Sequence, residues 1–241
     1  KLPVRTFCRT VKQAAAASQL SEFIIVPEEL INDELLGSVD SSKIIASPPR
    51  FITDEKRLAD RLSQLKDMGV KRLYCHTPDH IAVGRKTGYI LHGSFTLNVY
   101  NSYSAEYLKR IGLEDCVFSI ESTLPQIAGV CSPMPIGIAV YGRLPLMLTR
   151  NCPIKNEVGC GKCTKKLTDR TGRELPVACS KEYVEILNSD RLSMLDRTDE
   201  LKNISFGIAY LSDETDEEIR SALSGRKPQG NITRGLYYRG I

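Results

Sequence analysis

Four cysteines lie close together in the second half of the chain, at positions 152, 160, 163 and 179. The chain holds 8 cysteines in 241 residues, so a segment as long as 152–179 would hold about one cysteine by chance. Cys160 and Cys163 form a C-x-x-C motif with a glycine on each side of the first cysteine, and such a tight turn lets two thiolates converge on one ion. The set predicts a metal or iron–sulfur site with Cys152, Cys160, Cys163 and Cys179 as ligands.

Two occupants of this site stay open. A structural zinc site usually has two C-x-x-C pairs, whereas seven residues separate Cys152 from Cys160. Iron–sulfur clusters accept less regular spacing, and the segment 143–173 has eight basic residues against two acidic ones, which suits a thiolate cluster of negative charge. A [4Fe–4S] cluster is therefore favoured, with zinc as the alternative and a disulfide or redox pair as a further one.

A second group of polar residues follows runs of apolar residues that read as strands. Because the ends of parallel strands meet at one mouth of a barrel, these side chains would converge. Glu121 and Tyr141 are the candidate catalytic residues, Glu121 for proton transfer. The candidate substrate-binding residues are His76, Asn98, Asn101 and Arg143, the last a clamp for a carboxylate or phosphate. Each of these residues could instead have a purely structural role, because Asn often caps turns and an Arg before Leu-Pro can hold a loop in place.

Sequence motifs of proteolysis are missing. The chain has neither an H-E-x-x-H helix nor a G-x-S-x-G elbow. His76 and His80 are four residues apart, but Pro78 between them argues against one helical face. A cysteine nucleophile paired with a distant histidine stays open.

The elements that would position these residues alternate between strand and helix. The apolar runs predict buried parallel strands at 4–8, 23–27, 43–47, 72–77, 89–100, 116–121 and 136–142. Capped amphipathic helices are predicted at 53–69 and 104–112. The number of units favours an α/β fold with a TIM-like (βα) barrel, complete or incomplete.

The pattern changes after residue 149, which predicts a barrel region at 1–149 and a cysteine-containing α+β appendage at 150–241 that closes or caps it. The appendage is expected to contain a hairpin with its turn at 170–172, a helix capped at Ser180, a strand at 204–211 and a helix with a capping box from Thr215 to Glu218. The tail from Gly225 is rich in glycine, basic and weakly periodic.

Charge and hydropathy narrow the class of protein. The net charge is +4, from 33 basic and 29 acidic residues, so no global signature of nucleic-acid binding is present. No apolar run is long enough to span a membrane, and the clustered cysteines favour a cytoplasmic protein. The sequence does not begin with Met, which suggests a piece of a longer polypeptide with an upstream domain as its partner.

Several ordered motifs resemble one known family. The motifs are GSFTLNVYNS (93–102), SIESTLPQI (119–127), VYGRLPLMLTRNCP (140–153), CGKC (160–163), LTDRTGRELPV (167–177), ILNS (186–189) and the closing TRGLYYRGI. Together they resemble the collagenase-like peptidases of family U32, in particular the C-terminal half of its longer members. The resemblance covers most of residues 90–241.

This resemblance implies a barrel-like fold and an oxygen-sensitive iron–sulfur cluster on the four cysteines. Some relatives hydroxylate a pyrimidine of tRNA or rRNA without O2, with prephenate as the oxygen donor, and others hydroxylate a quinone precursor. The expected function is therefore O2-independent hydroxylation of an RNA base, with RNA and a small carboxylate metabolite as partners and no membrane. The alternatives are a thiol- or metal-dependent peptidase and a non-catalytic, zinc-stabilised domain of a longer enzyme.

Overall fold

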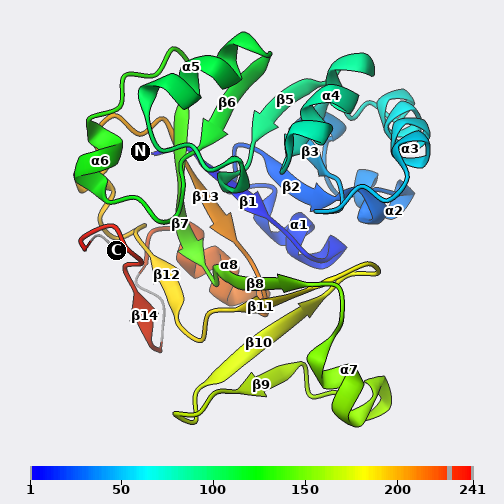
Figure 1. Cartoon of the computed structure of the whole chain (residues 1–241), viewed down its shortest axis with the longest axis vertical. Helices are drawn as coiled ribbons and strands as arrows, with labels where there is room; N and C mark the ends of the chain where they lie inside the picture. The colour runs from blue at the N-terminus through cyan, green and yellow to red at the C-terminus, as the bar shows by residue number, and fades with distance from the viewer. Residues whose placement is uncertain (1, 227–229, 240–241) are drawn as a thin grey trace.

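Eight parallel strands form a closed barrel in the computed structural model, which describes residues 2–226 and 230–239 (Figure 1). In chain order the strands are β1 (Val4–Phe7), β2 (Ile24–Pro27), β3 (Ile44–Ser47), β4 (Arg72–Cys75), β5 (Ile90–Gly93), β6 (Leu113–Val117), β7 (Ile136–Gly142) and β13 (Phe206–Tyr210). Each strand pairs with the next, and β13 closes the ring because it pairs in parallel with both β7 and β1. The expected TIM-like barrel is confirmed.

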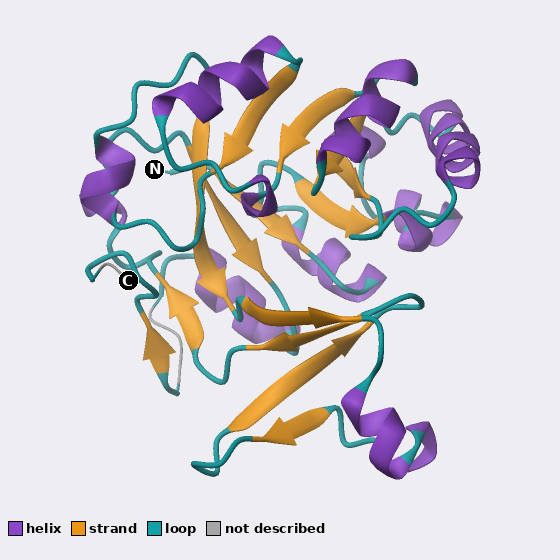
Figure 2. Ribbon diagram, in the orientation of Figure 1, coloured by secondary structure: helices purple, strands orange, loops and turns teal. Residues whose placement is uncertain are grey.

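Helices follow most of the barrel strands and lie outside the ring (Figure 2). They are α1 (Val11–Ala17), α2 (Asp33–Leu36), α3 (Glu55–Asp67), α4 (Pro78–Lys86), α5 (Ser102–Arg110), α6 (Leu124–Ala128) and α8 (Asp216–Leu223), with short 3-10 turns at Glu28–Leu30, Ser41–Lys43, Phe95–Leu97 and Thr198–Glu200. Helix α3 begins at its N-cap Asp54 and buries Leu58, Leu62 and Leu65 against the strands. The predicted capping box of α8 is present, with Thr215 and Glu218 bonding reciprocally.

A four-stranded antiparallel sheet is inserted between β7 and β13. Its strands are β8 (Pro145–Thr149), β9 (Lys166–Thr168), β10 (Glu174–Cys179) and β11 (Val184–Leu187), in the spatial order β8-β11-β10-β9. Helix α7 (Pro153–Val158) and the 3-10 turn η4 (Cys160–Lys162) connect β8 to β9. The predicted hairpin is confirmed as β9 and β10, and Gly172 takes the left-handed conformation that its turn requires, with φ of 81°. We call these residues, 145–187, the cover sheet.

The rest of the C-terminal region extends the barrel wall. Strand β12 (Arg191–Ser193) pairs antiparallel with β7, and β14 (Ile232–Thr233) pairs in parallel with β12. The chain therefore leaves the barrel once, to form the cover sheet, and returns to complete it with β13. The boundary expected at residue 149 thus falls at the end of β8, inside this insertion.

Three local expectations differ from the structure. Residues 95–97 form a 3-10 turn instead of a strand, with a single bridge from Val99 to Phe118. The strand expected at 116–121 lies at 113–117. Its first half contains the exposed Glu114 and the buried, ion-paired Asp115, and these charges hide it from a search for apolar runs. Ser180 caps no helix: its hydroxyl accepts the N–H of Tyr183 and turns the chain from β10 into β11.

Two separate hydrophobic cores stabilise the molecule. The first fills the barrel and the space beneath its helices. The second, in the cover sheet, consists of only four buried residues: Ile154, Val177, Val184 and Ile186. Within the described residues, none of the helices has the length and apolarity needed to cross a bilayer.

Candidate active site at the barrel mouth

A cavity of about 550 Å³ lies between the barrel mouth and the cover sheet. Its floor comes from the C-terminal ends of β1, β2, β3, β4 and β13, and its roof from β10 and β11. This is the end of a (βα) barrel at which active sites are built. Its volume is sufficient for a small metabolite or a single nucleoside.

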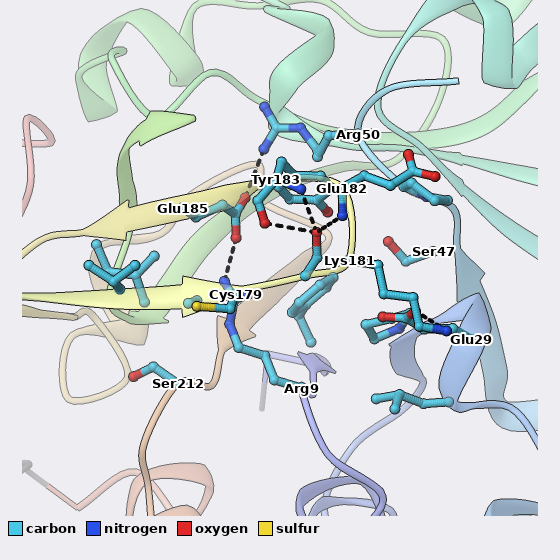
Figure 3. A pocket seen from close by; sticks show the side chains of 18 of the residues that line it. Arg9, Glu29, Ser47, Arg50, Cys179, Lys181, Glu182, Tyr183, Glu185 and Ser212 are labelled. Carbon is cyan, nitrogen blue, oxygen red and sulfur yellow. Dashed lines mark hydrogen bonds and ion pairs between the residues drawn. The ribbon is translucent and has the colours of Figure 1, made fainter. Parts of the chain in front are cut away.

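Two arginines converge on one carboxylate in this cavity (Figure 3). Arg9 follows β1, Arg50 follows β3, and Glu185 lies on β11 of the cover sheet. The distances to the Glu185 oxygens are 2.7 Å from Arg9 Nη2 and 3.1 Å from Arg50 Nη1. Glu185 is 7% exposed, so the pairs are largely shielded from water. Two positive charges share one negative charge, which leaves a local excess of one positive charge.

Weaker polar contacts hold the rim of the cover sheet. Lys181 lies 3.5 Å from Glu29, and Arg57 lies 3.6 Å from Glu182. Tyr183 meets Phe51 edge to face with ring centroids 6.1 Å apart. Since the two hydrophobic cores are separate, the cover sheet is docked on the barrel mainly through polar contacts.

A hydroxyl–imidazole pair lies on the cavity floor. Ser47, the last residue of β3, is 2.9 Å from Nε2 of His76, which follows β4. Burial, followed by the positive charge of Arg50 and the neighbouring imidazole of His80, holds the pKa of His76 well below 6.5. The imidazole is therefore neutral at physiological pH. His76 Nδ1 is buried and has no hydrogen-bond partner among the described residues.

The four cysteines gather at one end of the cover sheet. Cys152 is the N-cap residue of α7, Cys160 begins η4, Cys163 follows η4, and Cys179 ends β10. Cys179 also lines the cavity. It pairs across the strands with Val184, so its side chain shares the outer face of the sheet with the small core, whereas Glu185 faces the barrel. The cysteine site therefore borders the cavity without opening onto its centre.

The four cysteine thiols are chemically suited to bind a metal ion or an iron–sulfur cluster as thiolates. All four cysteines are free, and the backbone N–H of Lys165 donates to Cys163 Sγ at 3.3 Å, as outer hydrogen bonds do around bound sulfur. Partial burial, and then the nearby thiols of Cys152 and Cys163, raise the pKa of Cys179. No three His, Cys, Asp or Glu side chains within residues 2–226 and 230–239 stand in a finished metal-binding arrangement. The four ligands would have to close in around a bound group.

Of the six residues expected at the mouth, His76 lines the cavity. Asn98 ends the 3-10 turn in the left-handed conformation, with φ of 51°, and Asn101 caps α5 through Ser104. Glu121 is exposed and accepts a hydrogen bond from Tyr100. The three side chains lie outside the cavity lining.

Tyr141 and Arg143 lie at the end of β7. Tyr141 is 2% exposed, and its pKa is raised by burial and then by Glu214. Arg143 donates through Nη1 to the backbone carbonyls of Asn188 and Ser189. It therefore joins the two segments that connect the cover sheet to the barrel.

Four of the cavity residues that the sequence did not single out make the ion pairs and the hydroxyl–imidazole contact described above: Arg9, Ser47, Arg50 and Glu185. Arg9, Ser47 and Arg50 directly end or follow predicted strands, so the rule that selected His76 would have found them. Glu185 could not be found in this way, because its strand was not predicted. Its burial next to arginines appears only once the cover sheet folds over the barrel.

The sequence profile of peptidase family U32 matches residues 51–211, two thirds of the chain. The chain belongs to peptidase family U32. The matched region runs from the end of β3 to β13 and includes all of the cover sheet. The family and the barrel-like fold that the motifs implied are thereby confirmed.

Two of the solved structures that are similar to this U32 chain match it at low identity. The U32 peptidase Mk0906 is 12% identical, with a TM-score of 0.49, over 89% of this chain and 94% of that one. FabK from Thermotoga maritima is 14% identical, with a TM-score of 0.40, over 58% of this chain and 50% of that one. The U32 chain thus spans about half the length of FabK. No curated protein matches it.

Proposed function

We propose that this U32 chain is part of an enzyme that hydroxylates an RNA base without O2. In this proposal Cys152, Cys160, Cys163 and Cys179 hold a [4Fe–4S] cluster, and a small carboxylate metabolite binds in the cavity. One observation carries the proposal: the segment that carries the cysteines is the segment that roofs the cavity, with Cys179 in its wall.

The charges in the cavity support binding of a small anion. Arg9 and Arg50 are held in place by Glu185, yet each guanidinium keeps further N–H donors for a ligand. A planar guanidinium matches the geometry of a carboxylate. The barrel end would thus orient the metabolite, while the cover sheet would exclude water from it.

The cluster, when bound, would supply electron-transfer chemistry. The chain's own residues would hold it with four thiolates, and the Lys165 N–H would stabilise the negative sulfur of Cys163. The raised pKa of Cys179 means that binding of the metal would have to displace its proton.

Exposed basic residues near the cysteines support a contact with RNA. Lys155, Lys162 and Lys165 are exposed and make no ion pair with any described residue. Such side chains can neutralise phosphates, whose contribution to affinity falls with salt. In the basic tail, Arg234 pairs with Asp196 and Arg239 is exposed, whereas Lys227 lies outside the described residues.

Anaerobic purification tests this proposal directly. Iron, sulfide and zinc are measured in the wild-type chain, in a variant with Cys160→Ala and Cys163→Ala, and in Cys131→Ala as the matched control with an exposed cysteine outside the set. We expect about four irons and four sulfides per chain, lost only in the double variant. The loaded protein is then incubated with prephenate and tRNA or rRNA, and nucleosides are analysed for one added oxygen. Absence of iron would reject the cluster, and unmodified RNA with a loaded cluster would reject the substrate.

A structural zinc site is the second candidate, because the core of the cover sheet has only four residues. So small a core usually needs a metal or covalent staple. In this case the chain would bind one zinc and no iron, and removal of zinc would unfold the cover sheet and leave the barrel folded.

A further inference from the structure

Ser47 and His76 occupy the place at which a (βα) barrel presents its reactive groups. Ser47 is the last residue of β3, His76 directly follows the adjacent parallel strand β4, and both line the cavity. Ser47 Oγ and His76 Nε2 are 2.9 Å apart, within the range at which a base activates a hydroxyl. Ser47 is 4% and His76 8% exposed, so bulk solvent hardly reaches either group.

Hydrogen bonds fix the backbone of His76, and aromatic neighbours pack against its ring. The backbone N–H of His76 donates to Nδ1 of His80 at 3.0 Å, and the carbonyl of His76 accepts from the Thr96 hydroxyl at 2.7 Å. The ring also meets Tyr74 edge to face, with centroids 5.1 Å apart. An uncharged imidazole directed at a hydroxyl is the minimum arrangement for nucleophilic catalysis.

We propose that Ser47 and His76 form a nucleophile and general base that hydrolyse small esters or amides carrying a nearby carboxylate. Ser47 Oγ bonds to the substrate carbonyl carbon while its proton passes to His76 Nε2. The ester C–O or amide C–N bond then breaks, and the proton passes from Nε2 to the leaving group. Water releases the acyl group by the same proton transfers in reverse. This activity is independent of the four-cysteine site and of the hydroxylation proposed above.

The cavity fixes the class of substrate. Arg50 and Arg9 line the same cavity as the pair, and their excess positive charge favours an acyl group with a carboxylate. The volume of about 550 Å³ admits a small ester or a short peptide end but no folded chain.

The pair lacks the third member that orients a strong base. His76 Nδ1 has no partner among the described residues, so no carboxylate stabilises an imidazolium. Turnover is therefore expected to be slow, and a covalent adduct on Ser47 is the most direct observable.

A fluorophosphonate probe tests the pair in the whole chain. It forms an Oγ–P bond and releases fluoride, and the adduct is located by mass spectrometry in the tryptic peptide of residues 44–50. We expect the adduct on Ser47, no adduct on this peptide in Ser47→Ala, and labelling at least tenfold slower in His76→Gln. Ser212→Ala, which removes another cavity hydroxyl, should label like the wild type. Succinate should slow labelling by occupying the arginines.

Two results would overturn the proposal. The first is a folded wild-type protein that carries no adduct on Ser47 under conditions in which a serine esterase is fully labelled. The second is an equal labelling rate in folded His76→Gln. The first result is measured on the wild-type protein alone, so the proposal can be rejected even if a variant does not fold. Loss of the iron–sulfur cluster in the cysteine variant should leave labelling unchanged, which separates this test from that of the proposed function.

Discussion

The barrel and the cover sheet are built by different physical means. The barrel buries nearly every residue of its eight strands in one continuous core. The cover sheet has a four-residue core and contacts the barrel through ion pairs at Arg9, Arg50 and Arg57. Burial of apolar area stabilises the first, while paired charges and the cysteine site hold the second.

Because of this difference, the barrel side of the cavity is expected to be rigid and the cover-sheet side to be more mobile. Ser47 and His76 stand on the barrel, where side chains are fixed by packing. Glu185 and Cys179 stand on the cover sheet, which has few buried apolar contacts and is expected to open at lower free energy. Opening of the cover sheet would therefore widen the cavity while the reactive groups on the barrel keep their geometry.

The largest effect is expected inside the barrel, at Asp115. Its carboxylate lies 2.9 Å from Arg5 and 2.9 Å from His92, and it is 3% exposed. Asp115→Asn leaves Arg5 buried with only the half-exposed Glu22 as partner. The free energy of unfolding should fall by about 3–5 kcal/mol, as for other broken buried pairs. Urea unfolding measures this, with Asp60→Asn on the surface as control.

The same carboxylate makes the stability of the barrel depend on pH in the acid range. Burial alone would raise the pKa of Asp115, but the hydrogen bond from His92 and the charge of Arg5 outweigh burial and lower it. Its contribution to stability is therefore full above the unfolded value of about 3.9 and is lost as pH falls through the folded pKa. Urea midpoints between pH 7 and pH 3 should drop less steeply in Asp115→Asn than in the wild type. Parallel curves of urea midpoint against pH for the two proteins would show that Asp115 does not determine the loss of stability in acid.

Matched core deletions compare the two regions next. Ile208 is fully buried in β13, and Ile186 is 8% exposed in β11. Each Ile→Ala change removes about 2–4 kcal/mol of local packing energy. Ile208→Ala should lower the global unfolding midpoint, whereas Ile186→Ala should speed hydrogen exchange in residues 145–187 and leave the barrel amides protected. Loss of protection throughout Ile186→Ala would mean that the two regions unfold as one unit.

Glu185→Gln should have a smaller effect, confined to docking of the cover sheet. The change keeps the shape of the side chain but leaves Arg9 and Arg50 without their charge partner. We expect opening to become about tenfold more frequent, a change of about 1.4 kcal/mol, measured by limited proteolysis within residues 176–187. Glu174→Gln, which alters an exposed pair on the same sheet, is the control. Equal cleavage rates in both variants would show that the Arg9 and Arg50 pairs do not hold the cover.

The sequence predicted the barrel far better than the site. Apolar runs such as 136–142 are strands because both faces are buried, and this signal is local. The helix predicted to begin at Ser180 is absent, because a serine hydroxyl can stabilise a turn as readily as the start of a helix. Only the pairing of β10 with β11 decides between these two structures. His76 was found from its place after a strand. Glu185 was missed because its role depends on contacts with Arg9 and Arg50, more than 130 residues away in sequence.

The smallest effect is expected at the surface of the cover sheet. Lys166 and Glu174 lie 2.7 Å apart on β9 and β10, and both side chains are more than half exposed. Lys166→Ala should change hydrogen exchange of the hairpin by at most about 0.5 kcal/mol, and the difference should vanish at 1 M salt. An effect as large as that of Glu185→Gln would show that outer charges hold the sheet as firmly as the buried cluster, so that burial of Glu185 would no longer explain how the cavity is closed.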